Sequence, residues 1–216
     1  MTQQQTQSNQ NSNSSMKIIL VGDQSIGKTC VLIRFSRNEY NECYEATIGS
    51  NVYKEEIIVN EKKYKLDLWD TCGGEKYRRS LLPQFFRNAK CVVVTYATNN
   101  RNTFESLDYW IQIVNEIVGD EIPIVICATK SDCEVIVSPN DGKRFAKERN
   151  YPFISCSSKE NENIRELFEL CVKTILEHDL IETQLSETIE LNISTNEKRK
   201  SKCCSSKSKS IQESTQ

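Results

Sequence analysis

The stretch that decides the fold is GDQSIGKT, which runs from Gly22 to Thr29. It has two glycines separated by four residues, followed by a lysine and a hydroxyl residue, which is the pattern of a phosphate-binding loop. The apolar run Lys17–Val21 directly before it predicts a strand, and the residues from Lys28 to about Arg37 have a helical pattern. A strand, a loop and a helix in this order are the structural context that the pattern requires.

The chemistry of this loop suits a nucleotide phosphate. Gly22 and Gly27 permit backbone angles that aim several N–H groups at one point, and the helix N-terminus adds partial positive charge there. Lys28 can reach the β- and γ-phosphates, and the hydroxyl of Thr29 can bind Mg²⁺. Adenylate-type kinases, ATPases and GTPases all have such a loop, so it does not identify the nucleotide. The residues assigned to nucleotide binding here are Gly22, Asp23, Gln24, Ser25, Ile26, Gly27, Lys28, Thr29 and Cys30.

Composition and charge exclude several classes of protein. The chain has 216 residues with 28 basic and 30 acidic side chains, so its formal net charge is −2, which gives no reason to expect a nucleic-acid partner. No apolar run approaches the roughly 20 residues that span a bilayer, and no signal peptide is predicted. Ten cysteines without a CxxC pair indicate reduced thiols in a cytoplasmic protein.

Composition also divides the chain into three parts. Residues 1–16 include fourteen Gln, Asn, Ser or Thr and are predicted to form a disordered tail. Residues 17–180 hold all the glycines, prolines and tyrosines and have the length of one domain. Residues 181–216 are predicted to form a flexible tail, in which lysines and an arginine surround Cys203 and Cys204.

Strand-like and helical patterns alternate along residues 17–180. Two runs joined by a short polar turn predict an antiparallel hairpin, and two continuous apolar runs are typical of buried parallel strands. These four runs are Asn51–Val59, Lys62–Trp69, Cys91–Tyr96 and Ile122–Ala128. Helical apolar spacing occurs from Phe104 to Val118 and from Ile164 to Leu176. The alternation predicts an α/β fold with a mainly parallel sheet, which binds ligands at the carboxyl ends of its strands.

Two segments that follow predicted strands can recognise a guanine base. In Thr129-Lys130-Ser131-Asp132, the carboxylate of Asp132 can accept hydrogen bonds from guanine N1–H and N2–H₂, a donor pair that adenine lacks. The stem of Lys130 can lie along the face of the purine. Ser157-Ser158-Lys159 follows the short strand Tyr151–Ser155 and can present backbone N–H groups to the guanine O6 atom. The lysine and aspartate alone would also fit a solvated turn.

Two further segments provide candidate metal ligands. The segment DTCGGE, from Asp70 to Glu75, ends the strand-like run Lys62–Trp69. Asp70 can hold Mg²⁺ through a water, and the N–H of Gly73 can bind a γ-phosphate. Thr47 lies in a polar connection, and its hydroxyl can be a second protein ligand. The predicted metal-binding residues are therefore Thr29, Thr47 and Asp70.

With these five segments in order, the sequence resembles the small GTPases of the Ras superfamily over residues 17–180. It looks most like the Rab branch, because WDTCGGEKYRRS (69–80), FFRNA (85–89) and the block 92–111 are similar to Rab segments. The resemblance implies a three-layer phosphate-loop fold. Its sheet would have six strands, mostly parallel with one antiparallel edge strand, and five helices.

The resemblance also implies an activity and its partners. It implies a monomeric switch that binds GTP or GDP with Mg²⁺, hydrolyses GTP and acts in vesicle-mediated membrane trafficking. Exchange factors, activating proteins and effectors would contact the switch regions 40–50 and 70–82, which the γ-phosphate orders. By position, Tyr40 would pack on the guanine and Tyr44 would close over the phosphates. Asp132, Ser157, Ser158 and Lys159 would form the base site with Thr129, where asparagine is commonest in the family.

Departures from the family pattern affect the predicted catalysis. The catalytic residues would be Lys28, Gly73 and Gly74, but the family has a glutamine in place of Gly74 that orients the attacking water. Gln24 is larger than usual and can obstruct an incoming arginine finger, although its amide could partly replace the missing group. We therefore expect slow hydrolysis. The alternative is a scaffold that stays predominantly GTP-bound and hardly hydrolyses.

The C-terminal tail departs as well. Rab proteins typically end in one or two cysteines that carry geranylgeranyl groups, whereas Cys203 and Cys204 are followed by twelve residues. Lipidation of this pair and the nearby basic residues would together provide peripheral attachment to a cytosolic membrane surface. The alternative is a soluble tail whose basic run is merely solvated.

Overall fold

In a computed structural model, the chain consists of two units, 1–175 and 176–216. The residues described are 15–42, 47, 50–71, 82–119 and 122–204, with side chains up to Gln184. Within these residues, no helix is long and apolar enough to cross a membrane.

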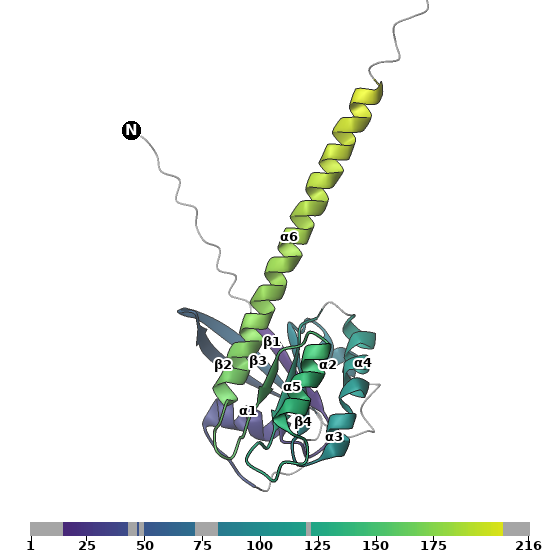
Figure 1. Ribbon diagram of the computed structural model, residues 1–216. Coiled ribbons are helices and arrows are strands. Elements are labelled where there is room, and N and C mark those ends of the chain that lie inside the picture. Colours follow the sequence, from purple (N-terminus) through teal and green to yellow (C-terminus); the bar gives the residue numbers. More distant parts are fainter. Residues whose placement is uncertain (1–14, 43–46, 48–49, 72–81, 120–121, 205–216) are drawn as a thin grey trace, which may run out of the picture. The chain divides into compact units, whose positions relative to one another are not determined.

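The first unit is built on a six-stranded sheet (Figure 1). Its strands are β1 (Met16–Gly22), β2 (Ser50–Val59), β3 (Lys62–Thr71), β4 (Cys91–Ala97), β5 (Ile124–Thr129) and β6 (Phe153–Ser155). They lie in the order β2-β3-β1-β4-β5-β6. Only the edge strand β2 is antiparallel to its neighbour, and every other pair is parallel. The predicted mostly parallel sheet with one antiparallel edge strand is thereby confirmed.

Helices cover both faces of this sheet. They are α1 (Lys28–Arg37), α2 (Leu82–Phe86), α3 (Arg101–Glu105), α4 (Leu107–Val118), α5 (Pro139–Glu148) and α6 (Ile164–Cys204). Ser106 alone separates α3 from α4. Counted as one interrupted helix, these two bring the described helices to the predicted five.

The central strand β1 shows why three layers form. Successive side chains of a strand point to opposite faces, and both faces of β1 are buried. Ile19 and Val21 belong to a core cluster with residues of α2, α4 and α5. Ile18 and Leu20 are equally buried but face the other way, toward the layer in which Phe35 of α1 contacts Phe168 of α6.

The last helix is longer than the sequence pattern indicates. Its apolar stripe ends near Leu176, whereas α6 continues to Cys204. Residues 181–216 contain no glycine or proline that would interrupt a helix. Leu180 and Ile181 on this extension are exposed. That residues 181–216 act as a flexible tail stays a prediction, as does the disordered tail 1–16, most of which lies outside the described residues.

Candidate functional site

The loop between β1 and α1 has the backbone of an anion-binding turn. Gly22 has φ 141° and Gly27 has φ 99°, values that residues with a side chain rarely adopt. A Cβ atom on Gly22 would lie 2.4 Å from the carbonyl oxygen of Thr95 on the neighbouring strand β4. Gly27 precedes α1 directly, so the first backbone N–H groups of that helix follow the loop. The loop is thus held against β4 at Gly22 and leads into the N-terminus of α1 at Gly27.

Lys28 in the first turn of α1 is turned back over this loop. Its side chain is 5 % exposed, and its Nζ donates to the carbonyl oxygens of Gly22 at 2.9 Å and Asp23 at 2.7 Å. These bonds hold the ammonium group above the loop and compensate its burial. The positive charge of Lys28 therefore lies close to the N-terminus of α1, where both would stabilise the negative charge of a phosphate group.

Thr29, Thr47 and Asp70 come together from three separate parts of the chain. Thr29 Oγ1 donates to Asp70 Oδ2 at 2.8 Å and lies 2.9 Å from Thr47 Oγ1, while Thr47 Oγ1 lies 3.2 Å from Asp70 Oδ2. The sequence predicts this set as metal ligands, although residues 29, 47 and 70 are far apart in the chain. The three side chains form a compact group of hard oxygen donors, the kind that Mg²⁺ prefers.

Asp70 supplies a test of whether a cation fits this group. The residue is 0 % exposed, and its Oδ1 atom has no hydrogen-bond partner within the described part of the chain. Burial raises the pKa of its carboxyl group, against the hydrogen bond from Thr29, the charge of Lys28 and the hydrogen bond from Thr47. A buried carboxylate with an unpaired oxygen needs a positive partner. The donor set therefore fits a divalent cation.

The predicted base motif is connected directly to the phosphate loop. The hydroxyl of Thr129, which is 2 % exposed, lies within hydrogen-bonding distance of the carbonyl oxygens of Ile26 (2.5 Å) and Tyr96 (3.0 Å). Lys130 has φ 60°, and its Nζ donates to the carbonyl oxygen of Ser25 at 2.8 Å. Threonine in place of the usual asparagine thus still links the end of β5 to the loop.

Asp132 and the segment 157–159 also lie beside each other. Ser157 Oγ donates to Asp132 Oδ1 at 2.5 Å, and the backbone of Ser157 pairs with that of Glu162 in both directions. Asp132 Oδ2 is within 3.6 Å of Cys133 Sγ. Lys159 forms an exposed ion pair with Glu42 at 3.4 Å. The two predicted base-recognition segments therefore form one structural unit at the carboxyl ends of β5 and β6.

Other predicted site residues either lie outside the described residues or contribute no side chain to the contacts above. Gly73, Gly74 and Tyr44 lie outside the described residues, and so do the side chains of Cys203 and Cys204. Gln24 and Ser25 are exposed, and Cys30 is half-buried with its thiol pKa raised by burial. Tyr40 lies with its ring centroid 5.8 Å from the guanidinium carbon of Arg34.

Two residues outside the motifs contact the site. Trp110 of α4 donates from Nε1 to Asp23 Oδ1 at 3.0 Å, so it links the phosphate loop to a core helix. From the sequence, Trp110 is predicted only as a core residue, because it belongs to the apolar stripe of its helix. The available signal is that a buried indole N–H usually has a hydrogen-bond partner. Arg34 of α1 contacts the segment 157–159, and no sequence motif indicates this.

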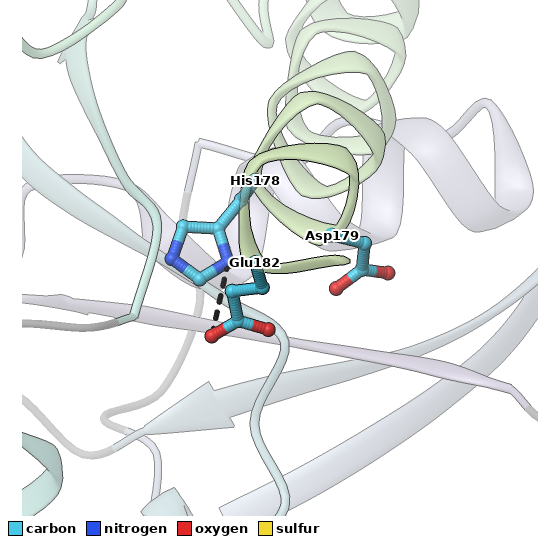
Figure 2. A group of neighbouring side chains, drawn as sticks. All are labelled: His178, Asp179 and Glu182. Atoms are coloured by element: carbon cyan, nitrogen blue, oxygen red, sulfur yellow. Dashed lines mark ion pairs between the residues drawn. The ribbon is translucent and has the colours of Figure 1, made fainter. Parts of the chain in front are cut away.

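A separate group on α6 has no such context. Figure 2 shows His178, Asp179 and Glu182, with His178 Nδ1 placed 3.8 Å from Glu182 Oε1 one helical turn away. All three side chains offer metal-ligand atoms within 4.8 Å of one another. They lie on one partly exposed helix segment, and exposed acidic groups are common without a metal ion. We assign no function to this group.

The fold and the site together define a class of protein. A mostly parallel sheet between helices, a phosphate loop opening α1 and the paired segments 129–132 and 157–159 at the ends of β5 and β6 are the features of a phosphate-loop nucleotide-binding protein. A model of the Ras family matches residues 17–177. The chain belongs to this family, and its sequence relatives make it a Rab-like small GTPase.

Those relatives match most of the chain. The Ras-related protein SEC4 of Saccharomyces cerevisiae is 34 % identical over 198 residues, which cover 88 % of this chain and 92 % of that protein. The Ras-related protein Rab-1A of Dictyostelium discoideum is 30 % identical over 82 % of this chain and 87 % of its own length. The Ras-related protein Rab-10 of Diplobatis ommata is 29 % identical over 88 % and 95 %.

Proposed function

We propose that this protein is a guanine-nucleotide switch that cycles between GTP and GDP states in vesicle-mediated membrane trafficking. The group formed by Thr29, Thr47 and Asp70 is the observation that carries the proposal, because it joins the phosphate loop, the predicted first switch region and β3 through shared oxygen contacts. The trafficking role follows from the Rab-type relatives.

The chain's own residues account for binding and switching. Lys28 and the N-terminus of α1 would stabilise the negative charge of the β- and γ-phosphates. Mg²⁺, held by Thr29 and Thr47 and through a water by Asp70, would neutralise phosphate charge. Because Thr47 lies in the predicted switch region 40–50, its position would depend on the γ-phosphate. Loss of that phosphate would release Thr47 and change the surface that partners contact.

Base selection would come from Asp132 and the segment 157–159. The carboxylate of Asp132 would accept from N1–H and N2–H₂ of guanine, while Ser157 Oγ holds its Oδ1 atom in place. Lys130 would lie along the purine, since its Nζ is already bound to the carbonyl oxygen of Ser25. Tyr40 would pack on the base and Tyr44 would close over the phosphates.

We further propose that hydrolysis is slow. Gly74 has no side chain to orient the attacking water, and the side chain of Gln24, which is exposed, would obstruct an incoming arginine finger. The test is a single-turnover GTP hydrolysis assay on the purified protein and on Gly74→Gln. We expect the substitution to raise the rate, whereas a rate that falls would refute the explanation.

The degree of hydrolysis separates two modes of action. A cycling switch should carry mostly GDP after purification, whereas a scaffold that hardly hydrolyses should retain GTP. The absence of a side chain at Gly74 is the feature that favours the scaffold. Chromatography of the nucleotide released from the denatured protein distinguishes them, because each mode predicts a different nucleotide.

Membrane attachment is proposed through the C-terminal tail. Acylation of Cys203 and Cys204, together with six nearby basic residues, would supply the two signals that stable anchoring needs, with about 1 kcal/mol from each basic residue near an anionic surface. Membrane fractionation of a Cys203→Ser/Cys204→Ser double variant tests this. Unchanged membrane content would exclude lipid on these thiols and favour a soluble tail.

A further inference from the structure

Arg34, near the end of α1, is bound to the backbone of the base-recognition segment. Its Nε donates to the carbonyl oxygen of Ser158 at 2.7 Å, and its Nη2 lies 3.3 Å from the carbonyl oxygen of Lys159. Its Nη1 donates to the carbonyl oxygen of Asn38 at 2.9 Å. The planar guanidinium group thus joins the C-terminal cap of α1 to two consecutive carbonyl groups of a segment more than 120 residues away.

These bonds determine where the neighbouring N–H groups point. In a planar trans peptide the C=O and N–H groups point in opposite directions. The carbonyl of Ser158 is held by Arg34, so the N–H of Lys159 must point away from Arg34. The carbonyl of Ser157 accepts from the N–H of Glu162 at 2.9 Å, which in the same way fixes the N–H of Ser158.

The two fixed peptides belong to the segment that would recognise the guanine O6 atom. Ser157 is fully buried and Ser158 is 9 % exposed, so this segment has little freedom to turn on its own. Arg34 is half-buried, and its own carbonyl oxygen accepts at 3.0 Å from the N–H of Asn38, the C-terminal cap of α1, which has φ 55°. The orientation of the Lys159 N–H group is therefore set from α1, the same helix whose N-terminus follows the phosphate loop, whereas the Ser158 N–H group is set by the pairing of Ser157 with Glu162.

We propose that Arg34 is a positioning residue for base selection: its guanidinium group fixes the plane of the peptide between Ser158 and Lys159 so that the N–H group of Lys159 meets the 6-oxo group of guanine. The inference rests on the proposed guanine-nucleotide function. Arg34 touches neither base nor phosphate in this account. It acts only through the two carbonyl groups that it holds.

Arg34→Met is the decisive variant, because methionine keeps the apolar stem and a good helix propensity but has no donor. The matched control is Arg37→Met, which removes the same charge from the exposed last turn of the same helix. Dissociation constants are measured for three nucleotides in Mg²⁺. GDP has all the contacts, 6-thioguanosine diphosphate has a sulfur in place of O6 and is a weaker acceptor, and inosine diphosphate lacks only the 2-amino group.

We expect Arg34→Met to weaken GDP binding about two- to tenfold, the effect of one hydrogen bond. Binding of the 6-thio nucleotide should change less, so the preference for GDP over it should fall. The preference for GDP over inosine diphosphate, which reports on Asp132, should stay the same. Arg37→Met should change none of the three constants.

Equal weakening of all three nucleotides in Arg34→Met would overturn the proposal, because a general loss of structure does not distinguish O6 from the 2-amino group. If Arg34→Met does not fold, Arg34→Lys replaces it. A single ammonium group can hold only one of the two carbonyl groups at a time, so Arg34→Lys should lower the preference for GDP over the 6-thio nucleotide without abolishing it. An unchanged preference overturns the proposal. A wild-type protein that prefers GDP no more than ADP would instead contradict the proposed function.

Discussion

The hydroxyl of Thr129 links the end of β5 to the phosphate loop, and its removal should lower both the stability of the fold and the affinity for nucleotide. The side chain is 2 % exposed, and its single O–H lies within reach of the carbonyl oxygens of Ile26 and Tyr96. Thr129→Val keeps the β-branched shape at the end of β5 and removes only this donor. The free energy of unfolding should fall by about 1–3 kcal/mol, the cost of leaving a buried carbonyl group without its partner.

Part of this cost should appear in nucleotide binding, because Ile26 belongs to the phosphate loop. We expect faster GDP release from Thr129→Val, up to about tenfold for each 1.4 kcal/mol that the bound state loses. Chemical denaturation gives the stability change, and displacement of a fluorescent GDP analogue gives the dissociation rate.

Thr174→Val is a suitable control for Thr129→Val. Its hydroxyl donates to the carbonyl oxygen of Leu170 within α6 at 2.8 Å, and an α-helix already supplies that carbonyl with a backbone partner. If Thr129→Val releases GDP no faster than Thr174→Val does, the hydroxyl of Thr129 does not hold the phosphate loop.

Three other predictions follow from the same geometry. Asp132→Asn should shift preference from GTP toward xanthosine triphosphate, because the hydrogen-bond complement at the base changes; competition binding measures this, and unaltered GTP affinity would remove Asp132 from the base site. Trp110→Phe should lose the hydrogen bond to Asp23 and speed GDP release a few-fold. The same bond can be tested from Asp23: Asp23→Asn keeps an acceptor for Trp110 Nε1 and Asp23→Ala does not, so Asp23→Asn should release GDP more slowly than Asp23→Ala. The thiols of Cys127 and Cys171 should resist alkylation of the native protein at pH 8, because both side chains are fully buried and their pKa values are raised. Mass spectrometry locates the labels. Modification of either thiol before that of the partly exposed Cys133 would be inconsistent with this burial.

Much of the site was accessible from sequence because its chemistry is local. GDQSIGKT predicts its own strand, loop and helix, and α1 has the predicted bounds Lys28–Arg37. The sequence also predicts Thr29, Thr47 and Asp70 as one set of metal ligands, because each has a hydroxyl or carboxylate oxygen in the phosphate loop, in a polar connection or at the end of a strand. Their contacts, at 2.8 to 3.2 Å, depend on the sheet that brings β1 beside β3.

Other features had no local signal. Helix α5 escapes the apolar periodicity because its buried residues are the small Gly142 and Ala146. A Cβ atom at Gly142 would lie 2.2 Å from the hydroxyl oxygen of Tyr96, so close packing on β4 explains a glycine inside this helix. Arg34 reads as an ordinary helix residue until the fold places the segment 157–159 beside it.

Lys28, the group formed by Thr29, Thr47 and Asp70, and Asp132 would together hold a guanine nucleotide with Mg²⁺. Displacement of bound fluorescent GDP by unlabelled GDP or ADP, with Mg²⁺ and then with a chelator, tests it most directly. We predict that GDP competes and ADP does not, and that removing Mg²⁺ speeds GDP release. Equal competition by ADP, together with release that is insensitive to Mg²⁺, would show that these residues do not form a guanine-nucleotide site.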